Sequence, residues 1–289
     1  MDAATFFQTV ANSVVLGSIY ATVAVCLALA FGVMQMANFA HGEFFMVGAY
    51  VVYVLYALMG VPFPLAVLAA FPIVAVLGLL AERFIFRKTR GNVLAGFMAT
   101  AGLALILQVL AGQTWGVGLM RSIPTPYMEV AELGPVRLGW QRLIVIPAAF
   151  AMMGALWLFL QRSKWGKGLR ACAQDPEAAA LNGIGNNRMA ALAMAIAGGL
   201  AGVSGALMAP IHAVTPYMGH SIIVTAFVIV IVGGMASIEG AILAAFLLGF
   251  IHTFTTTLFD AVVATMVGVA FMAIVLVIKP SGLLGRVRQ

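Results

Sequence analysis

Long stretches of this chain carry no charged residue, and this pattern constrains the fold more than any other feature of the sequence. No Asp, Glu, Lys or Arg occurs between Asp2 and Glu43, and comparable runs recur to the end of the chain. Only 8% of the residues are charged and 63% are apolar. A charge at the centre of a bilayer costs roughly 2.5–3.5 kcal/mol on insertion scales, so a lipid-embedded chain needs such a composition. Because the apolar runs are continuous rather than alternating, we predict an all-α, polytopic integral membrane bundle and not an outer-membrane barrel.

The lengths of the apolar runs predict eight or nine membrane spans in a single domain that covers residues 1–289. A span requires about 20 apolar residues. The expected spans lie near residues 10–33, 44–60, 63–82, 91–112, 142–160, 189–210, 221–238, 241–258 and 261–278. Eight crossings result if one of these runs is re-entrant or broken.

Basic residues gather in three clusters that predict the orientation of the chain. The clusters are Arg83, Arg87, Lys88 and Arg90; Arg162, Lys164, Lys167, Arg170 and Arg188; and Lys279, Arg286 and Arg288. The positive-inside rule places these clusters in the cytoplasm and the segment 113–142 outside. Nine crossings then put the N-terminus outside and the C-terminus inside. The net charge of +6 thus reflects topology, because no basic face interleaved with aromatic residues points to nucleic acid.

Polar residues interrupt the first apolar stretch in the sequence Asn38-Phe39-Ala40-His41-Gly42-Glu43. One interpretation is a solvated turn in which Asn38 or His41 caps a helix end. The other is a broken helix or tight turn at membrane depth, whose polar groups line a cavity, since ionisable residues in spans usually face the bundle interior. His41 and Glu43 are two positions apart and share no helix face, so we expect no metal site.

A second interruption contains the paired glycines Gly233 and Gly234, followed by Ser237 and Glu239. It predicts a turn or part of a broken helix, and the two alternatives stay open. The candidate residues of a substrate path are Asn38, His41, Gly42, Glu43, Gly233 and Gly234.

The loop at about 162–188 contains the pattern of a short, capped helix. Asp175 suits the N-cap, Pro176 the first helical position, Glu177 the positive helix end and Gly183 a left-handed close. A helix of about eight residues is marginal alone in water. It therefore needs a partner, which is either the membrane surface and the protein's own loops or a soluble subunit.

The external segment at about 113–142 is rich in Trp, Tyr and Pro, which suits an interfacial connector, a lid or a ledge for an extracytoplasmic partner. No P-loop, G-x-S-x-G or C-x-x-C motif occurs in the sequence. The chain is therefore not expected to hydrolyse ATP by a P-loop.

Taken together, the motifs resemble the permease subunits of bacterial ABC importers of the branched-chain amino-acid class, the LivH type, over essentially the whole chain. The resemblance is carried by Gly17–Ala21, Phe31–Met34, Asn38–Glu43, Gly168–Ala171 with Gly183-Ile184, Gly233–Met235 and Lys279–Gly285. Ala236 and Glu239 depart from the family pattern, which often has a further glycine and a proline or neutral residue there, and leave the geometry of that turn open.

The resemblance implies a permease in the bacterial inner membrane that works with a periplasmic binding protein, a second related permease and two cytoplasmic ATPases. ATP and Mg would bind the ATPases and no cofactor would bind this chain. The capped helix 175–183 would be the coupling helix, and the implied coupling residues are Arg170, Asp175, Pro176, Glu177, Ala178, Ala179 and Gly183. A heterodimer of permeases is favoured over a homodimer.

Relatives of this class carry branched-chain amino acids, and others carry further amino acids, urea, short amides or small carboxylates. Two other classes stay open. An ion-coupled secondary transporter would need buried acids, and the sequence has few of them. An intramembrane enzyme would use His41 and Glu43 as acid and base, but no nucleophile is identifiable beside them.

Overall fold

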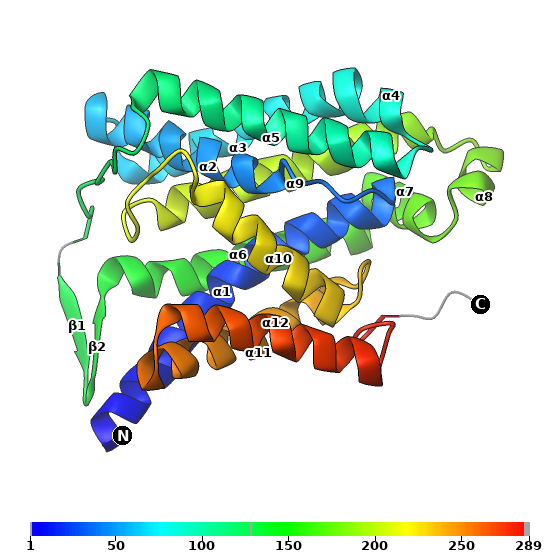
Figure 1. Cartoon of the computed structure of the whole chain (residues 1–289). Coiled ribbons are helices and arrows are strands. Elements are labelled where there is room, and N and C mark those ends of the chain that lie inside the picture. Colours follow the sequence, from blue (N-terminus) through cyan, green and yellow to red (C-terminus); the bar gives the residue numbers. More distant parts are fainter. Residues whose placement is uncertain (1, 128, 286–289) are drawn as a thin grey trace. The chain divides into compact units, whose positions relative to one another are not determined.

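The computed structural model describes residues 2–127 and 129–285, and it confirms the mostly helical fold (Figure 1). A two-stranded sheet is the addition that the sequence analysis did not foresee. In chain order the elements are α1 (Ala3–Met34), α2 (His41–Val52), the π-helix η1 (Tyr53–Leu58), α3 (Phe63–Ala81), the π-helix η2 (Glu82–Phe86), α4 (Arg87–Thr89), α5 (Val93–Trp115), β1 (Val130–Leu133), β2 (Val136–Gly139), α6 (Trp140–Arg162), α7 (Lys164–Gln174), α8 (Pro176–Leu181), α9 (Asn186–Met208), α10 (Met218–Gly233), α11 (Ile238–Leu258) and α12 (Ala261–Ile278).

Eight helical stretches among the described residues are long and apolar enough to cross a membrane. They are Ala3–Met34, His41–Leu58, Phe63–Thr89, Val93–Trp115, Trp140–Arg162, Asn186–Met208, Ile238–Leu258 and Ala261–Ile278. Each overlaps one predicted span, and the remaining prediction, 221–238, overlaps the apolar helix α10. With 16 residues, α10 is shorter than the roughly 20 that a full crossing needs, so eight and nine crossings are both compatible with the helix lengths.

Contacts between Cα atoms divide the chain into two compact units. The first unit comprises the chain up to Ala28, Thr125–Ala151 and the chain from Thr225 onward. The second comprises Leu29–Pro124 and Met152–Val224. The polar sequence Asn38–Glu43 and the loop 162–188 both belong to the second unit.

Three helices of the second unit, α2, α3 and α9, pack side by side as one block, which we call the α2–α3–α9 block (Figure 1). A Cβ atom on Gly48 of α2 would overlap the backbone of Gly202 in α9, and one on Gly205 of α9 would overlap the carbonyl of Phe45. Small residues at such crossings let helix backbones approach closely, which is a main source of helix association in lipid. The glycine content of these spans therefore reflects packing inside the block.

In the first unit, the segment after α12 folds back onto the turn between α10 and α11. The backbone N–H of Leu283 donates to the carbonyl of Val232 at 2.7 Å, and that of Leu284 donates to the carbonyl of Gly233 at 3.1 Å. Gly234 in this turn has a φ of +107°, which glycine adopts without strain. The closing segment thus holds the α10–α11 turn.

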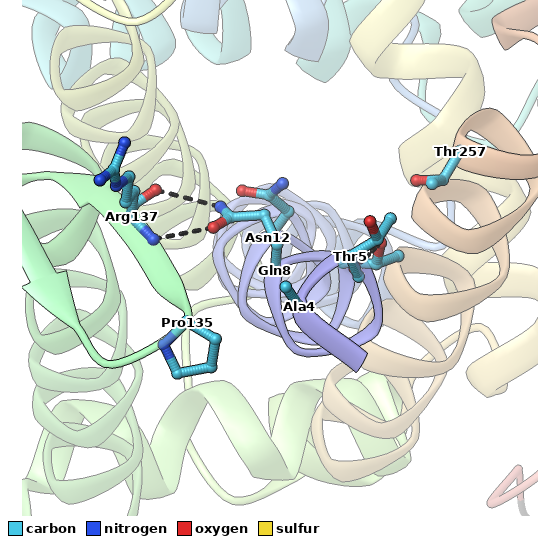
Figure 2. Close-up of a pocket in the computed structure, with 8 residues that line it drawn as sticks. Ala4, Thr5, Gln8, Asn12, Pro135, Arg137 and Thr257 are labelled. Carbon is cyan, nitrogen blue, oxygen red and sulfur yellow. Dashed lines mark hydrogen bonds between the residues drawn. The ribbon is translucent and has the colours of Figure 1, made fainter. Parts of the chain in front are cut away.

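The small sheet is a hairpin in the first unit, within the segment 113–142 for which the sequence analysis predicts an external location. Gly134, with a φ of +64°, forms its turn, and Glu132 pairs with Arg137 across the strands. Figure 2 shows how the carboxamide of Gln8 on α1 binds the outer edge of β2, accepting from the N–H of Arg137 at 2.8 Å and donating to its carbonyl at 3.1 Å. A cavity of about 320 Å³ lies between α1 and the hairpin, with Pro135 and Thr257 in its wall. The Gln8 side chain thereby occupies part of a strand edge that is otherwise open to pairing.

The packing of the block generates a test. Gly48→Ala should lower the free energy of unfolding by about 1–3 kcal/mol, because the new methyl group meets backbone that cannot move aside. Gly102→Ala in α5 is the matched control, since among the described residues no atom beyond its chain neighbours and the adjacent backbone of α5 lies within 4 Å of its Cβ position. It should be neutral or stabilise by up to about 1 kcal/mol through helix propensity. Thermal unfolding of the detergent-solubilised protein, followed by circular dichroism, measures both, and equal melting temperatures would contradict the packing argument.

Candidate functional site

The break between α1 and α2 is the first part of the candidate site. The chain leaves α1 at Gln35, whose φ of +54° is unusual for a residue other than glycine. The side-chain oxygen of Asn38 then accepts from the N–H of Ala40 at 3.0 Å, and α2 begins at His41. Asn38, His41 and Glu43 are 3%, 0% and 1% exposed. The interpretation as a solvated turn is therefore wrong, although Asn38 does bond to the turn. The break is buried, while the role of its polar groups in lining a cavity stays a prediction.

Several polar atoms of this break are buried and have no hydrogen-bond partner among residues 2–127 and 129–285. They are Nδ2 of Asn38, both ring nitrogens of His41 and Oε2 of Glu43. Buried polar groups in proteins are nearly always paired, and exceptions concentrate where a ligand, an ion or a conformational change completes them. The break thus holds a carboxamide, an imidazole and a carboxylate oxygen whose hydrogen-bonding capacity the described residues do not fill. No group of three or more His, Cys, Asp or Glu in the described part of the chain is arranged to hold a metal ion.

Glu43 has one side-chain partner, which comes from α5. Nε2 of Gln108 donates to Oε1 of Glu43 at 2.8 Å. The other oxygen, Oε2, faces Gly219 at the start of α10, where an added Cβ would lie 2.6 Å from it and from the carbonyl oxygen of Gly42. The glycines at positions 42 and 219 thus let the first turns of α2 and α10 meet around the carboxylate. This is a role for Gly42 that spacing alone did not indicate.

An apolar cavity of about 490 Å³ begins one helical turn beyond Glu43 and its partner Gln108. Met46 and Val47 of α2 and Leu107 of α5 form part of its wall. Tyr50 and Trp115 close one side, with stacked rings whose centroids are 4.3 Å apart, and the Tyr50 hydroxyl has no hydrogen-bond partner in the described part of the chain. A polar pair beside an apolar cavity matches the usual design of a small-molecule site.

Three residues of this region were missed by the sequence analysis, namely Gln108, Tyr50 and Trp115. A signal for Gln108 existed, because it is a carboxamide within the otherwise apolar and small-residue stretch 101–112 of the charge-free run 91–120. Nothing in the sequence pairs it with Glu43, from which it is 65 positions distant.

Gly233 and Gly234, the other predicted path residues, belong to the first unit. The contacts described for them serve the α10–α11 turn, where a Cβ on Gly234 would lie 2.6 Å from Gly285. Ser237 caps α11 by accepting from the N–H of Gly240 at 3.0 Å, so Ala236 and Glu239 leave a regular turn intact. The turn interpretation is confirmed, while a role in a substrate path stays a prediction.

The loop helix predicted at 175–183 is confirmed in its local geometry. Oδ1 of Asp175 accepts from the N–H groups of Glu177 at 2.9 Å and Ala178 at 3.0 Å. Pro176 occupies the first helical position of α8, and Gly183 closes the end with a φ of +80°. These caps fix both ends of a helix that has only six residues.

The two sides of α8 differ in exposure. Ala179 is buried against the protein, whereas Glu177 and Ala178 are exposed, and Leu181 is 90% exposed. On α7, the exposed Arg170 binds Gln161 at 2.9 Å. An exposed apolar side chain at the end of a capped helix is a feature that the sequence analysis did not single out.

The amino-acid sequence of this chain matches a known protein family and several known proteins. The family model described as "Branched-chain amino acid transport system / permease component" matches residues 9–279. The chain is 31% identical to the high-affinity branched-chain amino acid transport system permease protein BraD of Pseudomonas aeruginosa, over 97% of this chain and 96% of that protein. It is 30% identical to the corresponding permease protein LivH of Escherichia coli K12, with the same coverage. A probable branched-chain amino acid permease of Methanocaldococcus jannaschii is 24% identical over 75% of this chain.

The pairing of Gln108 with Glu43 can be tested by a double-mutant cycle. Gln108→Leu should lower the free energy of unfolding by about 1–3 kcal/mol, because it leaves both carboxylate oxygens of a buried Glu43 unpaired. In a Glu43→Leu background the same change should be nearly neutral, since both polar partners are then absent. Denaturant or thermal unfolding of the four proteins measures the difference. An equal cost in both backgrounds would show that the two side chains act independently.

Proposed function

Because this chain belongs to the family of permease components of branched-chain amino acid transport systems, we propose that it is the transmembrane permease subunit of an ATP-driven importer. Its residues 1–289 act as one permease domain that forms the path for branched-chain or related amino acids. The observation that carries the ATP-driven part of this proposal is helix α8, which is capped at both ends and exposes an apolar side chain.

Helix α8 supports the ATPase partners by its energetics. Six residues do not form a stable helix in water, even with good caps. Burial of Leu181 in a groove of another protein would supply the missing apolar contact. Two cytoplasmic ATPases occupy this position in our proposal, and they bind ATP and Mg. This chain is the non-catalytic partner, in which Arg170, Asp175, Pro176, Glu177, Ala178, Ala179 and Gly183 form or position the contact.

The polar break and the adjoining cavity support an amino-acid substrate. Asn38, His41 and Glu43 offer polar groups of the kind that a zwitterion needs, and Gly42 allows the close contact with α10. The apolar cavity beside them, with its Tyr50–Trp115 wall, suits an aliphatic side chain. Gly233 and Gly234 belong to the proposed path as well. They contribute to it by allowing the turn between α10 and α11.

The orientation follows from the basic loops. The clusters around Arg87 and Lys167, and Lys279 near the end of α12, favour a cytoplasmic C-terminus in the bacterial inner membrane, with the N-terminus in the periplasm if α10 crosses. Arg286 and Arg288 of the third cluster lie outside the described residues. The segment 113–142, with its hairpin, then faces the periplasm, where the binding protein would dock. The second permease is a related chain, so that the importer contains a heterodimer.

Loss of ATPase binding in an α8 variant tests the assembly. Leu181→Asp should reduce the ATPases that co-purify with the tagged chain by roughly 30-fold or more, the loss expected for a central apolar anchor worth about 2 kcal/mol. Val130→Asp in the hairpin is the control, because it also places a carboxylate on an exposed apolar residue but at the opposite predicted side of the membrane. Absence of ATPases from the unaltered chain, or their full retention by Leu181→Asp, would overturn the coupling role of α8.

Uptake by the assembled transporter in vesicles tests the substrate and the energy source. Leucine, isoleucine and valine should enter in an ATP-dependent manner, with the binding protein present. Uptake of urea, short amides or small carboxylates in their place would replace the amino-acid assignment. Uptake that survives ATP depletion and stops with an uncoupler would favour a secondary transporter.

A further inference from the structure

The first residue of α9, Asn186, binds both helices of the cytoplasmic loop. Its Nδ2 donates to the carbonyl oxygen of Pro176 at 2.8 Å, and its Oδ1 accepts from the thiol of Cys172 at 3.4 Å. Pro176 begins α8, and Cys172 lies in the last turn of α7. Burial raises the pKa of the Cys172 thiol, so this group keeps the proton that it donates. Asn186 therefore fastens the loop helices to the start of α9.

The next residue, Asn187, is anchored in a different direction. Its Oδ1 accepts from Nη1 of Arg90 at 2.7 Å, and Nη2 of Arg90 binds Glu82 at 2.9 Å. Arg87 binds the other oxygen of Glu82 at 3.1 Å. The Glu82 side chain is fully buried at the end of α3, so it depends on these two cations. Asn187 thus joins the first turn of α9 to α3, and not to α8.

The covalent link between α8 and α9 is short and contains two glycines. Residues 182–185 include Gly183 and Gly185, and glycine restricts the backbone less than any other residue. The N–H of Ile184 bonds to the carbonyl of Ala179 at 3.0 Å, which closes α8 without reaching α9. A push on α8 would therefore be absorbed by this link unless a side chain bridges the two helices, and the bond from Asn186 to Pro176 is such a bridge.

Beyond its first turn, α9 cannot move independently of its neighbours. A Cβ on Gly78 of α3 would lie 2.5 Å from the carbonyl oxygen of Met194, and Gly202 meets Gly48 of α2. Packed backbones of this kind shift together, because they have no side chains that can give way. Displacement of Asn186 would consequently move the α2–α3–α9 block, which carries the polar break at its α2 end.

We propose that Asn186 is the positioning residue that transmits movement of α8 to the α2–α3–α9 block, through its bond to Pro176. The inference rests on the proposed function, since it takes the ATPases as the source of the movement. Asn187 holds the same turn of α9 to α3 and takes no part in the link to α8. Loss of the Asn186 donor therefore separates ATP hydrolysis from transport, while α9 stays in place.

The neighbouring asparagines provide a matched pair of variants. Asn186→Asp keeps size and the acceptor for Cys172, and it removes the donor to Pro176. Asn187→Asp keeps the acceptor for Arg90 and adds the same charge at the same helix end. Both variants are assembled with the ATPases, the second permease and the binding protein in vesicles. ATP hydrolysis, uptake and the amount of bound ATPase are measured together.

We expect Asn186→Asp to bind the ATPases normally and to hydrolyse ATP, with uptake per ATP reduced about fivefold or more, the usual range of coupling between sites. Asn187→Asp should keep the wild-type ratio of uptake to ATP hydrolysis. Unchanged ratios in both variants, or equal losses in both, would overturn the proposal. If Asn186→Asp does not accumulate in the membrane, Asn186→Ala takes its place, and failure of both to accumulate would assign the bond to folding and likewise overturn it. Absence of ATP-dependent uptake in the unaltered transporter would instead refute the proposed function.

Discussion

Close approach of helix backbones at glycine is the constraint on which the second unit depends. Within lipid, helices gain little from burying apolar side chains against one another, because the surrounding tails are equally apolar. Packing must come from contact area, and Gly48, Gly202 and Gly205 bring the backbones of α2 and α9 together. The same rigidity that replaces hydrophobic stabilisation makes α2, α3 and α9 behave as one body. A unit that is built this way responds to force at one end by moving as a whole.

The two ends of this body have contrasting chemistry. At the start of α2, polar atoms of His41 and Glu43 are buried and incompletely paired, next to an apolar cavity. At the start of α9, by contrast, the carboxylate of Glu82 is satisfied by two arginines. Both oxygens of the Glu82 carboxylate are thus compensated by cations, whereas Oε2 of Glu43 and both ring nitrogens of His41 have no partner among the described residues. In the proposed function, the incompletely paired groups would serve recognition of a solute and the paired ones transmission of movement.

What could be predicted from the sequence was whatever depends on local pattern. The spans follow from runs without charge, and the caps of α8 follow from the spacing of Asp175, Pro176 and Gly183 within nine residues. The partner of Glu43 could not be predicted, because Gln108 approaches it only through the tertiary packing of α5. The hairpin escaped notice for a similar reason. Its strands have four residues each, and their edge is completed by a side chain from α1. Sequence analysis therefore located the break and the loop helix, while their tertiary contacts could be identified only from the structure.

The separation along the chain between each buried acid and its partners implies an order of events during biosynthesis. Glu82 meets Arg87 and Arg90 within five and eight residues, so its charge is compensated almost as soon as the segment leaves the ribosome. Glu43 must wait for Gln108, which follows 65 residues later. Helix α2 therefore enters the bilayer before Glu43 has its hydrogen-bond partner. The bond forms only when α5, which carries Gln108, is inserted beside α2.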